Sequence, residues 1–190
     1  LRKRTVLMKI TNSEKLILLM LSEIHEHLKI KSDIDPSFVK EAIHSGNTWG
    51  FEWQYPSLFE SYGSDSIEVT DVVNTLDMWL FIETAYKEFS AADKAKLLEI
   101  SPHYGKDPKF SGFDGNNEGE LLSIGRFLTE RLDRFTSFKG RIQDTHFPTI
   151  AGYRRMYEIF EPIRRTLDSR RLTVGEIGKI LNARNHPATD

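Results

Sequence analysis

Signals that start α-helices recur along the whole chain, and they constrain its fold more than any other feature. Thr11 with Glu14 forms a capping box before an apolar helix, and Thr173 with Glu176 forms another near the C-terminus. We therefore predict a predominantly α-helical protein, all-α in class, folded as a single domain over residues 1–190. The expected helices cover residues 16–28, 38–44, 70–89, 92–98, 118–138, 153–159 and the segment after Thr173.

Two short segments interrupt the helical pattern. Residues 5–10 alternate weakly, so residues 1–10 are predicted to form a basic arm or a short strand. Trp49, Phe51, Trp53 and Tyr55 are spaced by two, and an extended chain at residues 49–55 would place all four rings on one face. We favour a flap that covers the core. The alternative is a stacking platform for bases or another flat ligand.

Composition narrows the class of protein. The 190 residues suffice for one well-buried core, and the absence of cysteine excludes disulfides, thiolate metal sites and cysteine nucleophiles. The longest apolar run, Leu16 to Leu21, is too short to span a bilayer, so we expect no membrane association. No secretory signal is recognised at the N-terminus. We expect a cytoplasmic protein and, because residue 1 is Leu and not Met, a trimmed chain or a fragment.

Charge is distributed unevenly although the net charge is only −2. Residues 1–125 carry an excess of acidic side chains, and their basic residues are mostly Lys. Residues 126–184 carry an excess of basic side chains, mostly Arg, whose planar guanidinium suits carboxylate and phosphate. The Arg-rich part either pairs with the acidic part of the same chain or forms a surface for anions. We favour internal pairing, because overall neutrality argues against a nucleic-acid footprint.

Familiar enzyme motifs are missing from the sequence. There is no HExxH pair, no Gly-x-Ser-x-Gly elbow, no Walker loop and no GxGxxG fingerprint. Asp114, Asn116 and Glu118 match the opening of a calcium-binding loop, but Gly125 stands where the twelfth position requires a bidentate Glu. A turn followed by a helix capped by Asn116 or Asn117 fits this segment better. We therefore predict neither a metal nor a cofactor.

One sequence pattern, at residues 141–146, is associated with a known type of reaction. Arg141 and His146 have the R-x4-H spacing of a superfamily of small helical ribonucleases, in which Arg stabilises phosphate charge and His transfers a proton. Asp144 would orient the His. Gly140 and Pro148 indicate a loop here, whereas that motif belongs on or beside a helix. Arg141, Asp144 and His146 are therefore kept as catalytic residues of an alternative function only.

Helical geometry also predicts an ion pair. Glu83 falls on the apolar face of the longest expected helix, and Arg131 falls on the apolar face of the helix expected at residues 118–138. A buried carboxylate and a buried guanidinium each need a partner. We therefore predict that Glu83 and Arg131 form a structural ion pair, in preference to a ligand-binding role for either.

Five segments carry a resemblance to known proteins, through their order and spacing over most of the chain. They are TNSEKLILL from Thr11, VVNTLDMWLFIETAY from Val72, GFDGNNE from Gly112, GYRRMYEIF from Gly152 and LTVGEIGKILNA from Leu172. In these segments the chain is similar to the YfbU-like family of bacterial proteins. The resemblance implies a mostly helical bacterial domain, sometimes found beside DNA-binding modules, that binds a ligand or a partner. It brings no catalytic residues.

These features favour a non-catalytic binding or regulatory module that acts as a homo-oligomer. Its predicted binding surface combines aromatic and basic residues: Trp49, Phe51, Trp53, Tyr55, Arg141, His146, Tyr153, Arg154 and Arg155. The partner would be a small ligand or a protein, and nucleic acid is less favoured. Besides the ribonuclease, the second alternative is a DNA-binding regulator, because Arg2, Lys3 and Arg4 before a short strand resemble a ribbon-helix-helix arm.

Overall fold

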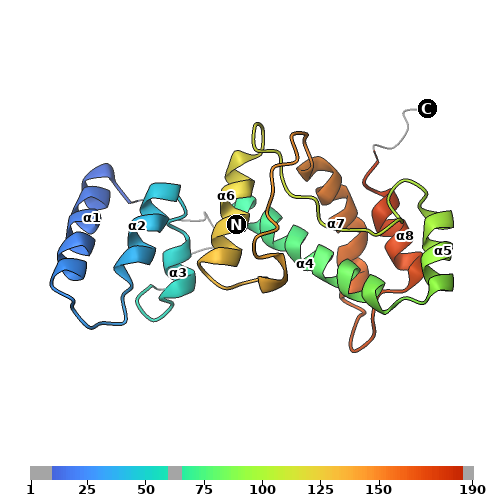
Figure 1. The fold of residues 1–190 in the computed structure, drawn as a ribbon, viewed down its shortest axis with the longest axis horizontal. Coiled ribbons are helices and arrows are strands. Elements are labelled where there is room, and N and C mark those ends of the chain that lie inside the picture. The colour runs from blue at the N-terminus through green and yellow to red at the C-terminus, as the bar shows by residue number, and fades with distance from the viewer. Residues whose placement is uncertain (1–9, 60–65, 186–190) are drawn as a thin grey trace, which may run out of the picture.

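The computed structural model describes residues 10–59 and 66–185 (Figure 1). Over these residues the chain is helical, and its only β-pairing is an isolated bridge between Phe113 and Asp144. The elements are α1 (Asn12–His27), α2 (Pro36–Ser45), α3 (Gly50–Gln54), α4 (Ile67–Glu88), α5 (Ala91–Ile100), α6 (Gly119–Glu130), the 3-10 helix η1 (Thr136–Phe138), α7 (Ile150–Arg164) and α8 (Val174–Asn182). The predicted all-α class is confirmed. Residues 1–9, where an arm or strand was predicted, lie outside the described residues.

The helix starts follow from side-chain caps. The capping boxes predicted at Thr11 and Thr173 are both present, and Ser90 forms a third at the start of α5. The Ser66 hydroxyl accepts a hydrogen bond from the Val69 N–H, so α4 begins before the predicted start at residue 70. The α2 helix ends at Gly46, whose φ of 78° is the left-handed conformation that suits a C-cap glycine.

The helices form an elongated row with α4 near the middle (Figure 1). The α4 helix packs against α6 and against α7, α7 packs against α8, and α8 packs against α5. The α1, α2 and α3 helices pack together at the opposite end of the molecule (Figure 1). Because α4 has neighbours on two sides, its buried residues are spread around the helix and include the polar Thr75 and Glu83. Of the helices that the structure describes, none is both long and apolar enough to cross a membrane.

Buried apolar side chains form two clusters that share α6. The N-terminal cluster consists of Phe38, Val39, Ala42, Ile43, Phe51 and Phe127. The main cluster is larger and is built by α4 to α8 together with the loops around Phe113 and Ile142. Within α6, Phe127 belongs to the N-terminal cluster, whereas Leu128 belongs to the main cluster. The α6 helix therefore joins the two ends of the molecule.

The extended segment predicted at residues 49–55 is wrong, because residues 50–54 form α3. Gly50 permits this helix to lie against α6, since a Cβ at Gly50 would come within 2.5 Å of Cε1 of Phe127. Residues two apart on a helix diverge by roughly 200°, so the four aromatic rings do not share a face. Phe51 lies in the N-terminal cluster, Trp53 packs on the main cluster, and Trp49 packs on both. The aromatic residues spaced by two therefore pack on two different apolar clusters and do not form one aromatic surface.

The helix predicted for residues 118–138 is shorter than expected. The α6 helix begins at Gly119, without a side-chain cap, and ends at Glu130. Asp133 and Phe135 both have a φ of 48°, a left-handed conformation that no α-helix can contain. These two residues redirect the chain into η1, where Phe138 is fully buried in the main cluster. Burial of one aromatic ring thus overrides the local helical pattern.

Candidate functional site

Two loops meet beside the start of α6, and they contain most of the residues that the sequence singled out. The backbone N–H of Phe113 donates to the carbonyl of Gln143 over 3.1 Å, and the N–H of Thr145 donates to the carbonyl of Phe113 over 3.0 Å. Asp144 accepts a hydrogen bond from the Gly115 N–H over 2.8 Å. The predicted loop at residues 140–148 is thereby fixed to the Gly-rich turn.

Glu118 holds this junction together. It is 7% exposed, and its carboxylate accepts hydrogen bonds from the N–H of Asp114 (3.0 Å), the N–H of Thr149 (2.7 Å), the hydroxyl of Thr149 (2.8 Å) and the N–H of Ile150 (2.8 Å). The last two N–H groups belong to the start of α7, which has no side-chain cap of its own. Glu118 therefore caps a helix that is distant in sequence.

The same bonds explain the calcium-like pattern. The buried Asp114 accepts hydrogen bonds from the Asn116 N–H and the Asn117 side-chain amide, so its carboxylate closes the turn. Glu118, the third residue of the pattern, is directed toward α7. Over the described residues, the structure contains no group of three or more His, Asp or Glu side chains that could hold a metal ion.

Glu83 is paired with Arg141, and the predicted pair with Arg131 is wrong. Two guanidinium nitrogens of Arg141 donate to the two carboxylate oxygens of Glu83 over 2.9 and 2.7 Å, and the Phe110 N–H donates to Glu83 over 3.0 Å. The hydrogen bond with Glu83 raises the pKa of Arg141 above its ordinary value. Arg131 lies at the C-cap of the shortened α6 and forms an ion pair with Glu41 of α2 over 2.9 Å. Arg131 follows Phe127 by four residues, so it lies on the side of α6 that faces the N-terminal cluster and α2.

Of the three residues of the ribonuclease-like pattern, Asp144 and His146 are paired with each other, whereas Arg141 is paired with Glu83. The Arg141 guanidinium is bound to Glu83, whereas the His146 side chain is 78% exposed and its Nδ1 lies 3.2 Å from Asp144. The N–H groups of Gly115 and His146 lower the pKa of Asp144. No hydrogen bond or ion pair among the described residues joins Arg141 to Asp144 or His146. The pair of Asp144 and His146 is exposed on a turn in which His146 has a φ of 57°.

The remaining residues of the predicted binding surface have structural partners. Tyr153 is fully buried, which raises its pKa, and its hydroxyl donates to the Gly112 carbonyl. Arg154 forms an ion pair with Asp71 of α4. Arg155 donates to the carbonyls of Ala183 and Arg184, at the C-terminus of α8, over 3.2 and 2.6 Å. These contacts hold helices together, and Tyr153 and Arg154 also line a small pocket of about 200 Å³ with Asp71.

The Arg-rich part of the chain pairs with the acidic part, as the charge distribution predicted. Ion pairs link residues from the two parts: Arg131 with Glu41, Arg141 with Glu83, Arg154 with Asp71, Arg164 with Asp77 and Arg171 with Glu88. Four of these acidic residues lie on α4, so the pairs connect α4 to the segments packed around it. The excess positive charge of residues 126–184 is therefore neutralised mainly by ion pairs within the chain.

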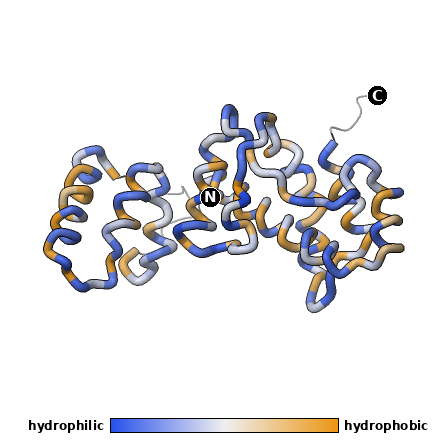
Figure 2. Tube along the Cα trace, in the orientation of Figure 1, coloured by the Kyte–Doolittle hydropathy of each residue, from blue (hydrophilic) through white to orange (hydrophobic). Residues whose placement is uncertain are grey.

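An apolar stripe on α1 is the most prominent feature that the sequence interpretation missed. Ser22 is the only residue of α1 that is buried. Large apolar side chains are exposed on the side facing away from α2: Leu16 59%, Ile17 55%, Met20 55%, Leu21 55%, Ile24 49% and Leu28 63%. These six residues are called the α1 stripe, and Figure 2 shows hydrophobic residues recurring along α1 at the end of the molecule. The apolar run from Leu16 to Leu21 was the sequence feature that could have indicated this stripe.

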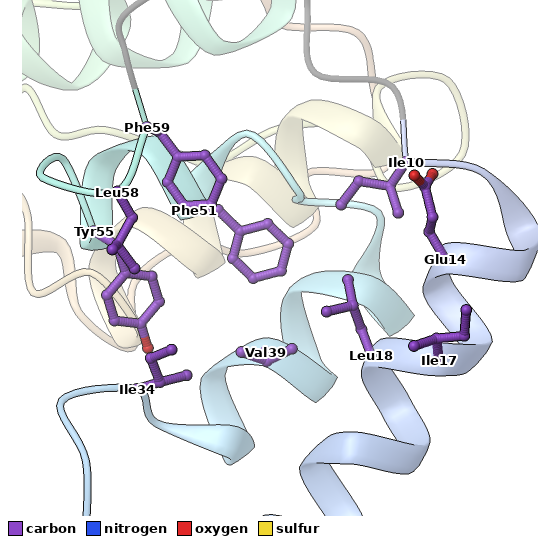
Figure 3. Close-up of a pocket in the computed structure, with 10 residues that line it drawn as sticks. All are labelled: Ile10, Glu14, Ile17, Leu18, Ile34, Val39, Phe51, Tyr55, Leu58 and Phe59. Carbon is purple, nitrogen blue, oxygen red and sulfur yellow. The ribbon is translucent and has the colours of Figure 1, made fainter.

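A groove adjoins the stripe between α1, α2 and α3 (Figure 3). It has a volume of about 430 Å³ and is lined by Ile10, Glu14, Ile17, Leu18, Ile34, Val39, Phe51, Tyr55, Leu58 and Phe59. Among the described residues that line the groove, Glu14 is the only charged one. Ile17 belongs to both the stripe and the groove, so the two are continuous. Together they form an apolar surface at one end of the molecule.

Comparison with known proteins places this architecture in a family. The model of the YfbU domain matches residues 8–183. The UPF0304 protein MJECS11 of Methanocaldococcus jannaschii is 30% identical over 80 residues, which cover 34% of this chain and 48% of that protein. The chain thus spans about half the length of this curated relative. No solved structure matches the chain. The family model covers nearly all of the described residues, and the chain belongs to the YfbU family.

Proposed function

We propose that this protein is a non-catalytic binding module that contacts an apolar helical surface of a partner protein through the α1 stripe and the adjoining groove. The observation that carries this proposal is the exposure of six large apolar side chains on one helix. The 16 residues of α1 form a little over four turns, and only one side of the helix is packed. The solvent side of a surface helix is normally polar, whereas this side exposes apolar residues.

The size of the apolar surface supports a protein partner. Six side chains of this size, each about half exposed, present on the order of 600 Å², which equals the largest apolar patches found on typical monomers. Ile30, Ile34 and Leu58 are also exposed and extend the patch toward the groove. An apolar helix laid along such a surface would be recognised through side chains at i, i+3 and i+4.

The distribution of polar groups disfavours other ligands at this surface. The stripe itself is apolar, and the groove carries a carboxylate, Glu14, as its charged group. A phosphate or a nucleic-acid backbone would be repelled there. Elsewhere the guanidinium groups of Arg141, Arg154 and Arg155 are engaged with acceptors of the same chain. These contacts support binding of an apolar protein surface over binding of an anion.

Dye binding tests whether the stripe is an accessible binding surface. An apolar fluorescent dye such as bis-ANS should bind the wild-type chain at low protein concentration, and Met20→Glu with Ile24→Glu should abolish most of the fluorescence gain. Leu98→Glu is the matched control, since Leu98 is 42% exposed on the distant α5. Both positions are exposed, so circular dichroism should show an unchanged helix content. Equal dye binding by a monomeric wild type and the stripe variant would reject the proposal.

One observation keeps the ribonuclease as a second candidate. Asp144 faces Nδ1 of His146 over 3.2 Å, an arrangement that can orient an imidazole for proton transfer. The test is cleavage of single-stranded RNA by wild type and His146→Asn. Asn is chosen because it tolerates the left-handed φ of 57° at this position better than Ala. Cleavage that is absent in the wild type, or equal in the variant, rejects this candidate. The DNA-binding alternative rests on Arg2, Lys3 and Arg4, which lie outside the described residues.

A further inference from the structure

We propose that the partner of the apolar surface is a second copy of this chain, with the two α1 helices packed antiparallel about a two-fold axis near Met20 and Leu21. This inference rests on the proposed function and names its partner. Closed two-fold dimers are the commonest assemblies of soluble proteins, and their interfaces pair one patch with itself. The patch must therefore be self-complementary in shape and in charge.

The spacing of the stripe satisfies the requirement of shape. Ile17 lies three residues before Met20, and Ile24 lies three residues after Leu21. In an antiparallel pair with its axis between Met20 and Leu21, Ile17 of one copy meets Ile24 of the other, and Met20 meets Leu21. Apolar side chains thus face apolar side chains along the central two turns of both helices. Positions 17, 21, 24 and 28 also repeat with the 4-3-4 spacing of a packing seam between helices.

Charge selects the antiparallel over the parallel arrangement. Glu14 lies in the first turn of α1, whereas His27, Lys29 and Lys31 lie in or just after its last turn. A parallel pair would bring the two Glu14 carboxylates together at one end of the seam, and would align the two helix dipoles. An antiparallel pair places each Glu14 beside the basic end of the other copy. The like-charge contact is removed and two complementary contacts replace it.

The groove accounts for the apolar residues that continue beyond the stripe. It opens beside the first half of α1, where Ile10, Glu14 and Ile17 form one wall (Figure 3). In the antiparallel pair the last turn of the other copy lies along this wall. Leu28 and Ile30 of the other copy, which are 63% and 48% exposed in one chain, then reach the mouth of the groove. Each copy supplies both a groove and the side chains that cover it.

The area agrees with a stable dimer. The stripe with Ile30, Ile34 and Leu58 offers on the order of 900 Å² of apolar surface per copy, against roughly 800 Å² per partner in a standard stable interface. A small-molecule ligand would cover the groove and leave most of the stripe exposed. The second copy covers both. Continuity of the stripe with the groove therefore favours a second chain over a small ligand.

Sedimentation of the full chain tests the association. We expect a mass twice the 22.0 kDa of one chain at micromolar concentration. Met20→Glu places two carboxylates at the two-fold axis and should weaken association at least 100-fold, whereas Leu98→Glu should leave the mass unchanged. A wild type that stays monomeric at high concentration, but whose stripe binds bis-ANS, overturns the inference and leaves the proposed function standing. A dimer that persists in Met20→Glu overturns it as well. A monomer that binds no dye rejects both.

Cysteine cross-linking tests the geometry, since the natural chain contains no cysteine. Met20→Cys should form a disulfide between copies on mild oxidation. Ile17→Cys alone should not, because antiparallel packing separates the two positions by seven residues along the axis, about 10 Å and beyond disulfide reach. An equal mixture of Ile17→Cys and Ile24→Cys should cross-link between the two variants. Strong cross-linking of Ile17→Cys with itself, and none in the mixture, would establish a parallel pair and overturn the antiparallel geometry.

Discussion

Glu118 and Thr149 are joined by two hydrogen bonds, one from the backbone N–H and one from the hydroxyl of Thr149, across 31 residues of sequence. The same carboxylate receives the first N–H of α7 from Ile150 and closes the turn at Asp114. A single buried side chain thus fixes the start of α6, the start of α7 and the turn before α6. The start of α7 is thus capped by a side chain that lies outside α7.

Glu118→Gln should therefore destabilise the protein. The amide keeps one acceptor oxygen but replaces the other with a donor that faces N–H groups, so at least one buried donor loses its partner. We expect the free energy of unfolding to fall by about 2–3 kcal/mol. Urea denaturation followed by circular dichroism measures this. Glu120→Gln, at an exposed position in the first turn of α6, is the control and should change stability by less than about 0.5 kcal/mol.

Arg141→Met should be more costly than the loss of any exposed ion pair. The Glu83 side chain is only 9% exposed, and without Arg141 its carboxylate keeps the hydrogen bond from the Phe110 N–H as compensation for its charge. We expect a loss of about 3 kcal/mol. Glu83→Gln in the same chain should recover part of that loss, because it removes the unpaired charge. Arg171→Met, which breaks an exposed pair with Glu88, should cost under about 1 kcal/mol. Equal effects at Arg141 and Arg171 would contradict the buried pair.

The start of α8 should weaken in acid. The hydrogen bonds from Arg170, with smaller contributions from Thr173, lower the pKa of Glu176 from 4.5 to about 2. A carboxyl whose pKa is lower in the folded chain stabilises the fold above about pH 4.5, and this stabilisation is lost as the pH falls toward 2. Because Arg170 is 44% exposed, we expect a loss of only about 1–2 kcal/mol. In Glu176→Gln the unfolding free energy should vary less with pH over this window than in wild type, and Glu99→Gln is the exposed control.

Gly112→Ala should be strongly destabilising. Gly112 has a φ of 111°, and a Cβ there would lie 2.0 Å from the carbonyl oxygen of Gln143. Alanine cannot fit unless the two loops separate, which breaks the hydrogen bond between Phe113 and Gln143. We expect a loss of about 3 kcal/mol or more. Gly119→Ala offers a control, since a Cβ at Gly119 meets no atom within 4 Å and alanine favours the helix. Thermal melts of the two variants should therefore shift in opposite directions or by very different amounts.

The sequence predicted those parts of the fold that depend on local interactions. Thr11 with Glu14 and Thr173 with Glu176 start helices because each cap is closed within four residues. Pairing of the Arg-rich part with the acidic part of the chain was also predictable, since it follows from the distribution of charged residues along the sequence. The partner of Glu83 was not, because Arg141 reaches Glu83 only after the chain turns at the left-handed residues Asp133 and Phe135, a turn that the helical pattern did not predict.

The candidate site was predicted less well than the fold. Spacing by two at Trp49, Phe51 and Trp53 has the same appearance in a strand and in a helix that lies between two cores. The residues of the α1 stripe were recognisable in the sequence as an apolar run. The run alone does not show how many sides of the helix are packed against the rest of the protein. That number follows from the tertiary arrangement, in which α1 packs mainly on α2.

The position of α6 between the two clusters limits how the molecule can move. Phe127 and Leu128 are consecutive, so their side chains point about 100° apart, one into each cluster. A rotation of α6 about its own axis that moves Phe127 deeper into one cluster withdraws Leu128 from the other. The two clusters therefore hold α6 against rotation from opposite sides, and the hydrogen bonds of Glu118 hold its start. The junction between the two ends of the molecule is thus a fixed connection and not a hinge.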